Sequence, residues 1–210
     1  MRFLITTGPT REHLDAVRFL SNPSTGRMGF AVARAAVRAG HDATVVAGPI
    51  SLPPPEGVEV VPVVSTEEMF AACMERLGEA DVFVAAAAPC DFRPAERFDG
   101  KLKKGSGSLV LTLVETPDIL LEAGRRKGER VHIGFALEAQ DARANALGKL
   151  RRKRLDAIVL NSPSAFGSER SSVTLFRADG AEESLEGVSK DALGERLVQL
   201  AEEIRKARTP

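Results

Sequence analysis

One stretch, DVFVAAAA at residues 81–88, limits the folds open to this chain more than any other. After its first aspartate it is continuously apolar, without the polar and apolar alternation of a strand that has one face in water. Strands of this kind are typical of a parallel sheet covered by helices on both faces. The run therefore predicts a central strand of an α/β fold.

Strand and helix patterns alternate along the rest of the chain. Apolar residues at helical spacing mark 28–39, 66–77 and roughly 142–154, and another helix is expected to open at Pro117. A last amphipathic helix follows Ser189. Its apolar face is expected to carry Leu193, Leu197, Leu200 and Ile204. Further strands are expected at 3–6, 43–46, 58–64, 109–114, 131–136 and 157–160, with residues 172–176 pairing with a strand near 184.

This order predicts a three-layer, doubly wound α/β fold of the Rossmann-like kind. Its sheet should be mainly parallel, with a small antiparallel extension near the C-terminus. A length of 210 residues fits one domain over 1–210.

Composition excludes several classes of protein. The 29 basic residues balance the 29 acidic ones, so no net field attracts nucleic acid or an anionic membrane. No apolar run approaches the roughly 20 residues that span a bilayer, and the N-terminus turns polar too soon for a signal peptide. A cytoplasmic location is expected. Cys73 and Cys90 alone make neither a disulfide framework nor a metal site.

In doubly wound sheets the ligand lies beyond the carboxyl ends of the strands. The loops to examine are therefore 7–27, 87–104, 115–118 and 135–140. The first loop ends in Ser24, Thr25 and Gly26 directly before a helix, where backbone N–H groups can bind an anion. Arg18 could add a bidentate phosphate contact. Plain capping of the helix by Ser24 is the alternative.

Gly26 and Gly29 match the dinucleotide-binding fingerprint G-x-G-x-x-G only weakly, so they predict no nicotinamide cofactor. In the second loop, the small residues Ala87 and Ala88 would let a ligand lie against the backbone. Asp91 follows them.

A lysine-rich segment, KLKK, begins at Lys101 within a predicted flexible lid at about 93–108. Such a lid could neutralise a polyphosphate, and a solvated run of surface charge is the alternative. Lys149 and Lys153 are four residues apart on a predicted helix, so both project from one face. Their alternatives are a solvated helix or an RNA-contacting patch, and the neutral net charge argues against the latter.

Six motifs, taken together, resemble the phosphopantothenate–cysteine ligase family, the synthetase domain of the bacterial bifunctional protein of coenzyme A biosynthesis. They run in the family's order through residues 6–161. They are TTGPTREHLDAVRFLSNPSTGRMG, AAAAPCDFRP, KLKK, ETPDIL, GFALE and KLRRKRLDAIVLN.

The resemblance implies a two-step ligation of 4′-phosphopantothenate to L-cysteine. CTP would activate the carboxylate as an acyl-cytidylate, and the amine of cysteine would then displace CMP. The resemblance also implies Mg²⁺, a homodimer, and a phosphopantothenoylcysteine decarboxylase that is fused or separate.

The same resemblance assigns roles to residues. Asn22 would handle the acyl-cytidylate, and Lys101 would be the lid lysine needed to form it. Substrate contacts would come from Arg18, Asn22, Ser24 and Gly26. Nucleotide contacts would come from Ala87, Ala88, Asp91, Lys101, Pro117, Asp118, Ile119, Leu120, Phe135, Lys149 and Lys153.

Two other functions are the alternatives to this ligase. A short-chain oxidoreductase would need an intact glycine fingerprint and a Tyr-x-x-x-Lys pair, and the chain has no tyrosine. A nucleotide-binding domain of the same fold that is non-catalytic or a scaffold stays open, because fold alone does not fix function.

Overall fold

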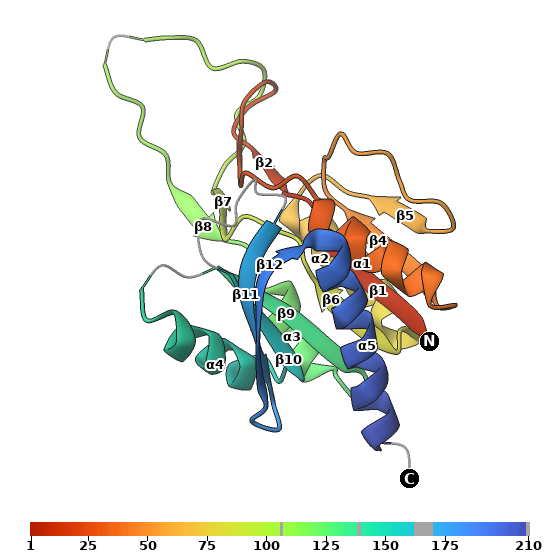
Figure 1. Cartoon of the computed structure of the whole chain (residues 1–210). Helices are drawn as coiled ribbons and strands as arrows, with labels where there is room; N and C mark the ends of the chain where they lie inside the picture. Colours follow the sequence, from red (N-terminus) through yellow and green to blue (C-terminus); the bar gives the residue numbers. More distant parts are fainter. Residues whose placement is uncertain (106, 138–139, 162–169, 209–210) are drawn as a thin grey trace.

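The computed structural model describes residues 1–105, 107–137, 140–161 and 170–208 (Figure 1). Residue 106 of the predicted lid, residues 138–139 of the fourth predicted loop and the last residue of the GFALE motif lie outside the described residues. The strands are β1 (Arg2–Thr7), β2 (Arg11–His13), β3 (Phe19–Ser21), β4 (Asp42–Ala47), β5 (Glu59–Pro62), β6 (Val82–Ala85), β7 (Phe92–Pro94), β8 (Leu113–Glu115), β9 (Val131–Leu137), β10 (Ala157–Asn161), β11 (Arg170–Arg177) and β12 (Glu182–Ser189). The helices are α1 (Arg27–Arg38), α2 (Thr66–Arg76), α3 (Ile119–Arg125), α4 (Ala142–Arg152) and α5 (Lys190–Arg208), with a short 3-10 turn, η1 (Leu77–Glu79).

Eight strands form the main sheet in the order β12-β11-β10-β9-β6-β1-β4-β5. The six strands from β10 to β5 in this order are parallel to one another, whereas β11 pairs antiparallel with both β10 and β12. The predicted central strand is β6, which pairs with β1 on one side and β9 on the other. The predicted fold class, including its antiparallel extension, is confirmed.

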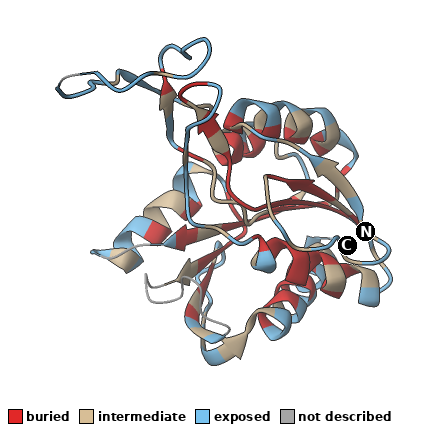
Figure 2. Ribbon diagram, turned by 90° about the horizontal axis from the view of Figure 1, so that it is seen from above, coloured by how far each residue is buried: buried red, intermediate tan, exposed pale blue. Residues whose placement is uncertain are grey.

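Helices cover both faces of the sheet. One face packs on α1 and α5 through a buried cluster that includes Phe30 and Leu197, and the other face packs on α2, α3 and α4. The four apolar residues predicted for the last helix are all buried. Figure 2 shows the buried residues concentrated in the strands and on the inner sides of the helices. None of the helices in the described ranges has the length and apolar content needed to cross a membrane.

Several helix ends follow the local sequence. Ser65 caps α2, with its hydroxyl accepting from the Glu68 N–H while the Glu68 carboxylate accepts from the Ser65 N–H. The chain leaves α1 through Gly40, whose φ of 79° is accessible to glycine at little cost.

Three predicted strands differ from the structure. β6 ends at Ala85, because the next three alanines leave the sheet to line the cavity described below. The edge strand β5 is shorter than 58–64 and covers only Glu59–Pro62. A proline is tolerated there because β5 lies at the edge of the sheet. The prediction of a strand at 109–114 was wrong for most of its length: only Leu113–Glu115 is a strand.

That strand, β8, pairs with β7 in a separate two-stranded sheet at the root of a long excursion away from the core (Figure 1). Apolar composition predicted extension there, but the segment has no partner in the main sheet. The first predicted loop likewise holds a hairpin, β2–β3, that its composition did not reveal.

Candidate functional site

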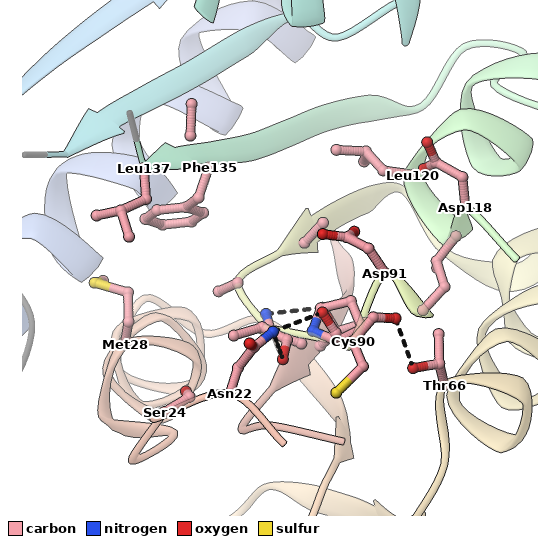
Figure 3. A pocket seen from close by; sticks show the side chains of 18 of the residues that line it. Asn22, Ser24, Met28, Thr66, Cys90, Asp91, Asp118, Leu120, Phe135 and Leu137 are labelled. Atoms are coloured by element: carbon pink, nitrogen blue, oxygen red, sulfur yellow. Dashed lines mark hydrogen bonds between the residues drawn. The ribbon is translucent and has the colours of Figure 1, made fainter. Parts of the chain in front are cut away.

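A cavity of about 840 Å³ opens at the carboxyl ends of the parallel strands, between the starts of α1 and α3. Its size lies in the upper part of the range for ligand pockets, roughly 300–1,000 Å³. Figure 3 shows Phe135 and Leu137 on one wall, Asp118 and Leu120 on another, and Asn22 beside the chain at Cys90. Thirteen residues assigned from the sequence line it: Asn22, Ser24, Gly26, Ala87, Ala88, Asp91, Pro117, Asp118, Ile119, Leu120, Phe135, Lys149 and Lys153.

The start of α1 forms one wall through close backbone packing. Gly26 is the N-cap residue, with a φ of 75°, and its carbonyl accepts a 2.7 Å hydrogen bond from the Thr7 hydroxyl. The alternative that Ser24 caps the helix was wrong. Within the described ranges no side chain caps α1, and the Ser24 hydroxyl instead accepts from the Gly26 N–H at 3.4 Å. Since the turn places Gly26 at the N-cap, Ser24 precedes the helix by too many residues to cap it.

Asn22 joins the two loops that meet at the cavity. Its side-chain amide donates to the carbonyl oxygens of Ala88 at 3.3 Å and Pro89 at 3.0 Å. These two bonds fix the position of the amide and connect the loop before α1 to the chain that follows β6.

Lys149 and Lys153 both line the cavity, but they have different partners. The helix α4 ends at Arg152, so Lys153 is its C-cap residue and not part of a helix that runs to 154 as predicted. The Lys149 ammonium donates to the Phe135 carbonyl at 2.7 Å, and that of Lys153 pairs with the Asp118 carboxylate at 2.8 Å. Asp118 also caps α3 by accepting from the Leu121 N–H at 3.0 Å. Burial acts to raise the pKa of Asp118, but the hydrogen bonds from Lys153 and Leu121 outweigh it and hold the pKa below its usual value.

Buried polar groups form the floor around Cys90. Its carbonyl accepts from the Thr116 hydroxyl at 2.6 Å, and its N–H donates to the Thr10 hydroxyl at 2.9 Å. The buried Glu12 carboxylate accepts from both the N–H and the hydroxyl of Thr66 at 2.8 Å. Burial raises the pKa of the Cys90 thiol, so this cysteine is a poor nucleophile at neutral pH.

Two of the fifteen assigned residues, Arg18 and Lys101, are not among those that line the cavity. Arg18 instead binds the buried Asp15 carboxylate through two nitrogens and donates to the Leu102 carbonyl at 2.7 Å. Asp15 in turn accepts from the Leu102 N–H at 3.1 Å. Arg18 and Asp15 therefore connect the first loop to the lysine-rich segment through hydrogen bonds to the backbone of Leu102. Lys101, the residue before Leu102, is exposed.

Sequence reasoning missed several lining residues, notably Arg27, Asn161 and Lys190. Asn161 ends β10, so the rule on carboxyl ends could have identified it. Lys190 opens α5, and only the tertiary packing of that helix beside α1 brings it to the cavity. Among the described residues, no three His, Cys, Asp or Glu side chains gather as a metal site of their own would require.

Comparisons with known proteins show which family the chain resembles. The coenzyme A biosynthesis bifunctional protein CoaBC of Bacillus subtilis is 43% identical over 204 residues, which cover 94% of this chain and 50% of that protein. The chain thus spans about half the length of this relative. The crystal structure of the C-terminal domain of a CoaBC superposes with a TM-score of 0.86 at 34% identity, covering 98% of this chain and 96% of that one.

A Cab2 mutant in complex with phosphopantothenate-cysteine shares the fold, with a TM-score of 0.79 at 17% identity, covering 98% of this chain and 86% of that one. The family model of the DNA/pantothenate metabolism flavoprotein C-terminal domain matches residues 1–204. The chain belongs to this family.

Proposed function

We propose that the chain is a phosphopantothenate–cysteine ligase, acting as one domain over 1–210. The observation that carries this proposal is that thirteen of the fifteen residues assigned by the family motifs line one cavity, although they come from distant parts of the sequence. The relationship to CoaBC proteins and the phosphopantothenate-cysteine bound to Cab2 support the choice of substrates.

The reaction we propose has two steps. The carboxylate of 4′-phosphopantothenate attacks the α-phosphate of CTP, and pyrophosphate leaves as an acyl-cytidylate forms. The amine of cysteine then attacks the acyl carbon, the new C–N bond forms, and the bond to CMP breaks. No base is needed in the first step, because a carboxylic acid is already ionised at neutral pH. The barrier is the approach of two anions, which cations and N–H donors at the cavity lower.

Different residues of the cavity would bind different parts of the two substrates. Residues 117–120 at the start of α3 and Phe135 would bind the base and ribose, and the paired lysines Lys149 and Lys153 would bind the nucleotide as well. The first turn of α1 would bind phosphate. Asn22, held by Ala88 and Pro89, would orient the mixed anhydride for the amine. Amides suit this role because they are neutral and offer both donors and an acceptor.

Magnesium would offset charge on the triphosphate when bound. Mg²⁺ commonly takes one or two protein carboxylates together with substrate phosphates and water. Asp91 and Glu115 supply carboxylates to the lining, and Figure 3 shows that of Asp91 projecting into the cavity. This donor set fits the ion, and Asp91 is the residue we assign to it.

Lys101 would reach the triphosphate when the lid at about 93–108 moves toward the cavity. We expect Lys101→Gln to abolish acyl-cytidylate formation while the melting temperature stays unchanged, because exposed loop residues contribute within about 0.5 kcal/mol. Lys103→Gln, on the same exposed segment, is the matched control and should retain activity. Normal pyrophosphate release by the Lys101 variant would reject the lid role.

A second copy of the chain is the partner we propose. Among the residues that the structure describes, eight of the ten exposed large apolar side chains lie at 17–19 and 92–114, on the β2–β3 and β7–β8 hairpins and the excursion. Clustered exposed apolar surface marks interfaces. A substitution at Val110, whose side chain is 86% exposed, tests this surface. If the surface forms the dimer, light scattering should show that the Val110→Asp variant is a monomer.

A pyrophosphate-release assay with CTP, 4′-phosphopantothenate and cysteine tests the function. Release that requires phosphopantothenate, with product formed only when cysteine is added, is the expected result. Nucleotide binding without turnover would favour the non-catalytic alternative. Comparing CTP with ATP would test the choice of nucleotide, and activity at neutral pH would agree with the cytoplasmic location predicted from the sequence.

A further inference from the structure

The packing of α1 against α5 brings two cations together at the mouth of the cavity. Arg34 pairs with Asp191 at 2.7 Å and Arg38 with Glu195 at 2.9 Å, so residue numbers rise together and the two helices run parallel. Their N-termini therefore lie at the same end, where the cavity opens. Helix N-termini carry partial positive charge, and two of them here point the same way.

A close contact sets the register of the two helices. At Gly194 an added Cβ would lie 2.7 Å from the Ala31 carbonyl oxygen, so the backbones touch there. Residues four positions earlier lie one turn nearer the N-terminus on the same face. Those residues are Arg27 and Lys190, and both line the cavity.

Further along the two helices, arginines of α1 pair with acidic residues of α5. At the cavity, Arg27 and Lys190 are both positively charged. Burial and, after it, the positive charge of Arg27 lower the pKa of Lys190. Two like charges close enough to influence each other repel in the absence of a ligand. An anion between them would remove this repulsion and would gain two charge-assisted hydrogen bonds.

We propose that Arg27 and Lys190 form an anion subsite of the cavity that takes a phosphate group of one of the two phosphorylated substrates. This inference rests on the proposed function. The group is either the pyrophosphate end of the nucleotide or the 4′-phosphate of phosphopantothenate, which share the same charge and oxygen acceptors.

Binding of inorganic pyrophosphate and inorganic phosphate, measured by calorimetry, tests the subsite without relying on turnover. We expect Arg27→Gln and Lys190→Gln each to weaken binding about threefold to tenfold, as loss of a partly exposed charged hydrogen bond should. Arg38→Gln and Lys206→Gln, on the same helices but away from the cavity, are the controls.

Kinetics then identify the source of the phosphate. A raised KM for CTP alone assigns the subsite to the nucleotide, and a raised KM for phosphopantothenate alone assigns it to the 4′-phosphate. Unchanged anion binding and unchanged KM values in both variants would overturn the subsite. That result is distinct from failure of the proposed function, in which the wild type itself forms no product.

Discussion

Replacing Gly29 with alanine tests how closely α1 must approach β1 for the cavity to form. Gly29 lies in the first turns of α1, over the end of β1. An added Cβ would lie 2.4 Å from both the Cβ and the hydroxyl of Thr7 and 3.0 Å from the Thr6 carbonyl. Carbon atoms normally approach to about 3.5–4.0 Å, so the helix would have to shift by about 1 Å.

Gly148 in α4 is a matched control, since an added Cβ there meets nothing within 4 Å. Alanine in a helix interior is about 1 kcal/mol better than glycine, so Gly148→Ala should stabilise the protein by up to that amount. At Gly29 the same gain is opposed by overpacking of about 1–3 kcal/mol and by strain on the hydrogen bond from Thr7 to Gly26, worth about 1 kcal/mol.

The two variants should therefore differ by about 3 kcal/mol in the free energy of unfolding. For a chain of this size about 1 kcal/mol corresponds to roughly 2–4 °C in Tm, so Gly29→Ala should melt about 6–12 °C below Gly148→Ala. Thermal unfolding followed by circular dichroism measures this difference. The KM for the nucleotide should rise in Gly29→Ala only, because the displaced turn forms a wall of the cavity. Equal melting temperatures would refute the packing argument.

Three further predictions concern the site and the core. Asn22→Asp should form acyl-cytidylate poorly or fail to pass it to cysteine, because a carboxylate would face two carbonyl oxygens; mass spectrometry showing wild-type turnover would leave Asn22 as a turn residue. Lys149→Ala and Lys153→Ala should each raise the KM for the nucleotide. Lys153→Ala should also lower Tm, because Asp118 loses its ion pair with Lys153. Unchanged kinetics in both variants would show that the two lysines are only surface charges. His132 is buried, and burial, followed by the charge of Lys127, lowers its pKa to about 4. The unfolded histidine binds a proton near 6.5, so stability should fall by about 3 kcal/mol as pH drops from 6.5 to 4, and denaturant titrations of His132→Phe should lack this share of the loss.

The position of the candidate site could be predicted well because it depends on a general property of the fold. Parallel strands end at one edge, so the loops that follow them converge there whatever their sequence. Four loops chosen on this ground contain most of the cavity lining. The glycines of the first loop were harder to interpret: Gly26 and Gly29 looked like a weak nucleotide fingerprint, and the structure shows that Gly29 is required for close packing on Thr7.

Sequence alone determined the features that local burial and local hydrogen bonding encode. The continuous apolar run at 81–88 specified a buried parallel strand, Ser65 and Glu68 specified the start of α2, and the spacing of leucines specified the buried face of α5. These signals arise within a few residues, so no distant partner is needed to interpret them.

Only the tertiary structure decided which distant groups meet. It placed residues 109–112 outside the sheet, paired Arg18 with Asp15 and Leu102, and brought Lys190 beside Arg27. Each outcome depends on contacts between segments far apart in the chain, and the composition of either segment gives no information on its partner. A charged side chain is equally compatible with solvent, an ion pair or a ligand, and packing of the surrounding elements selects among them.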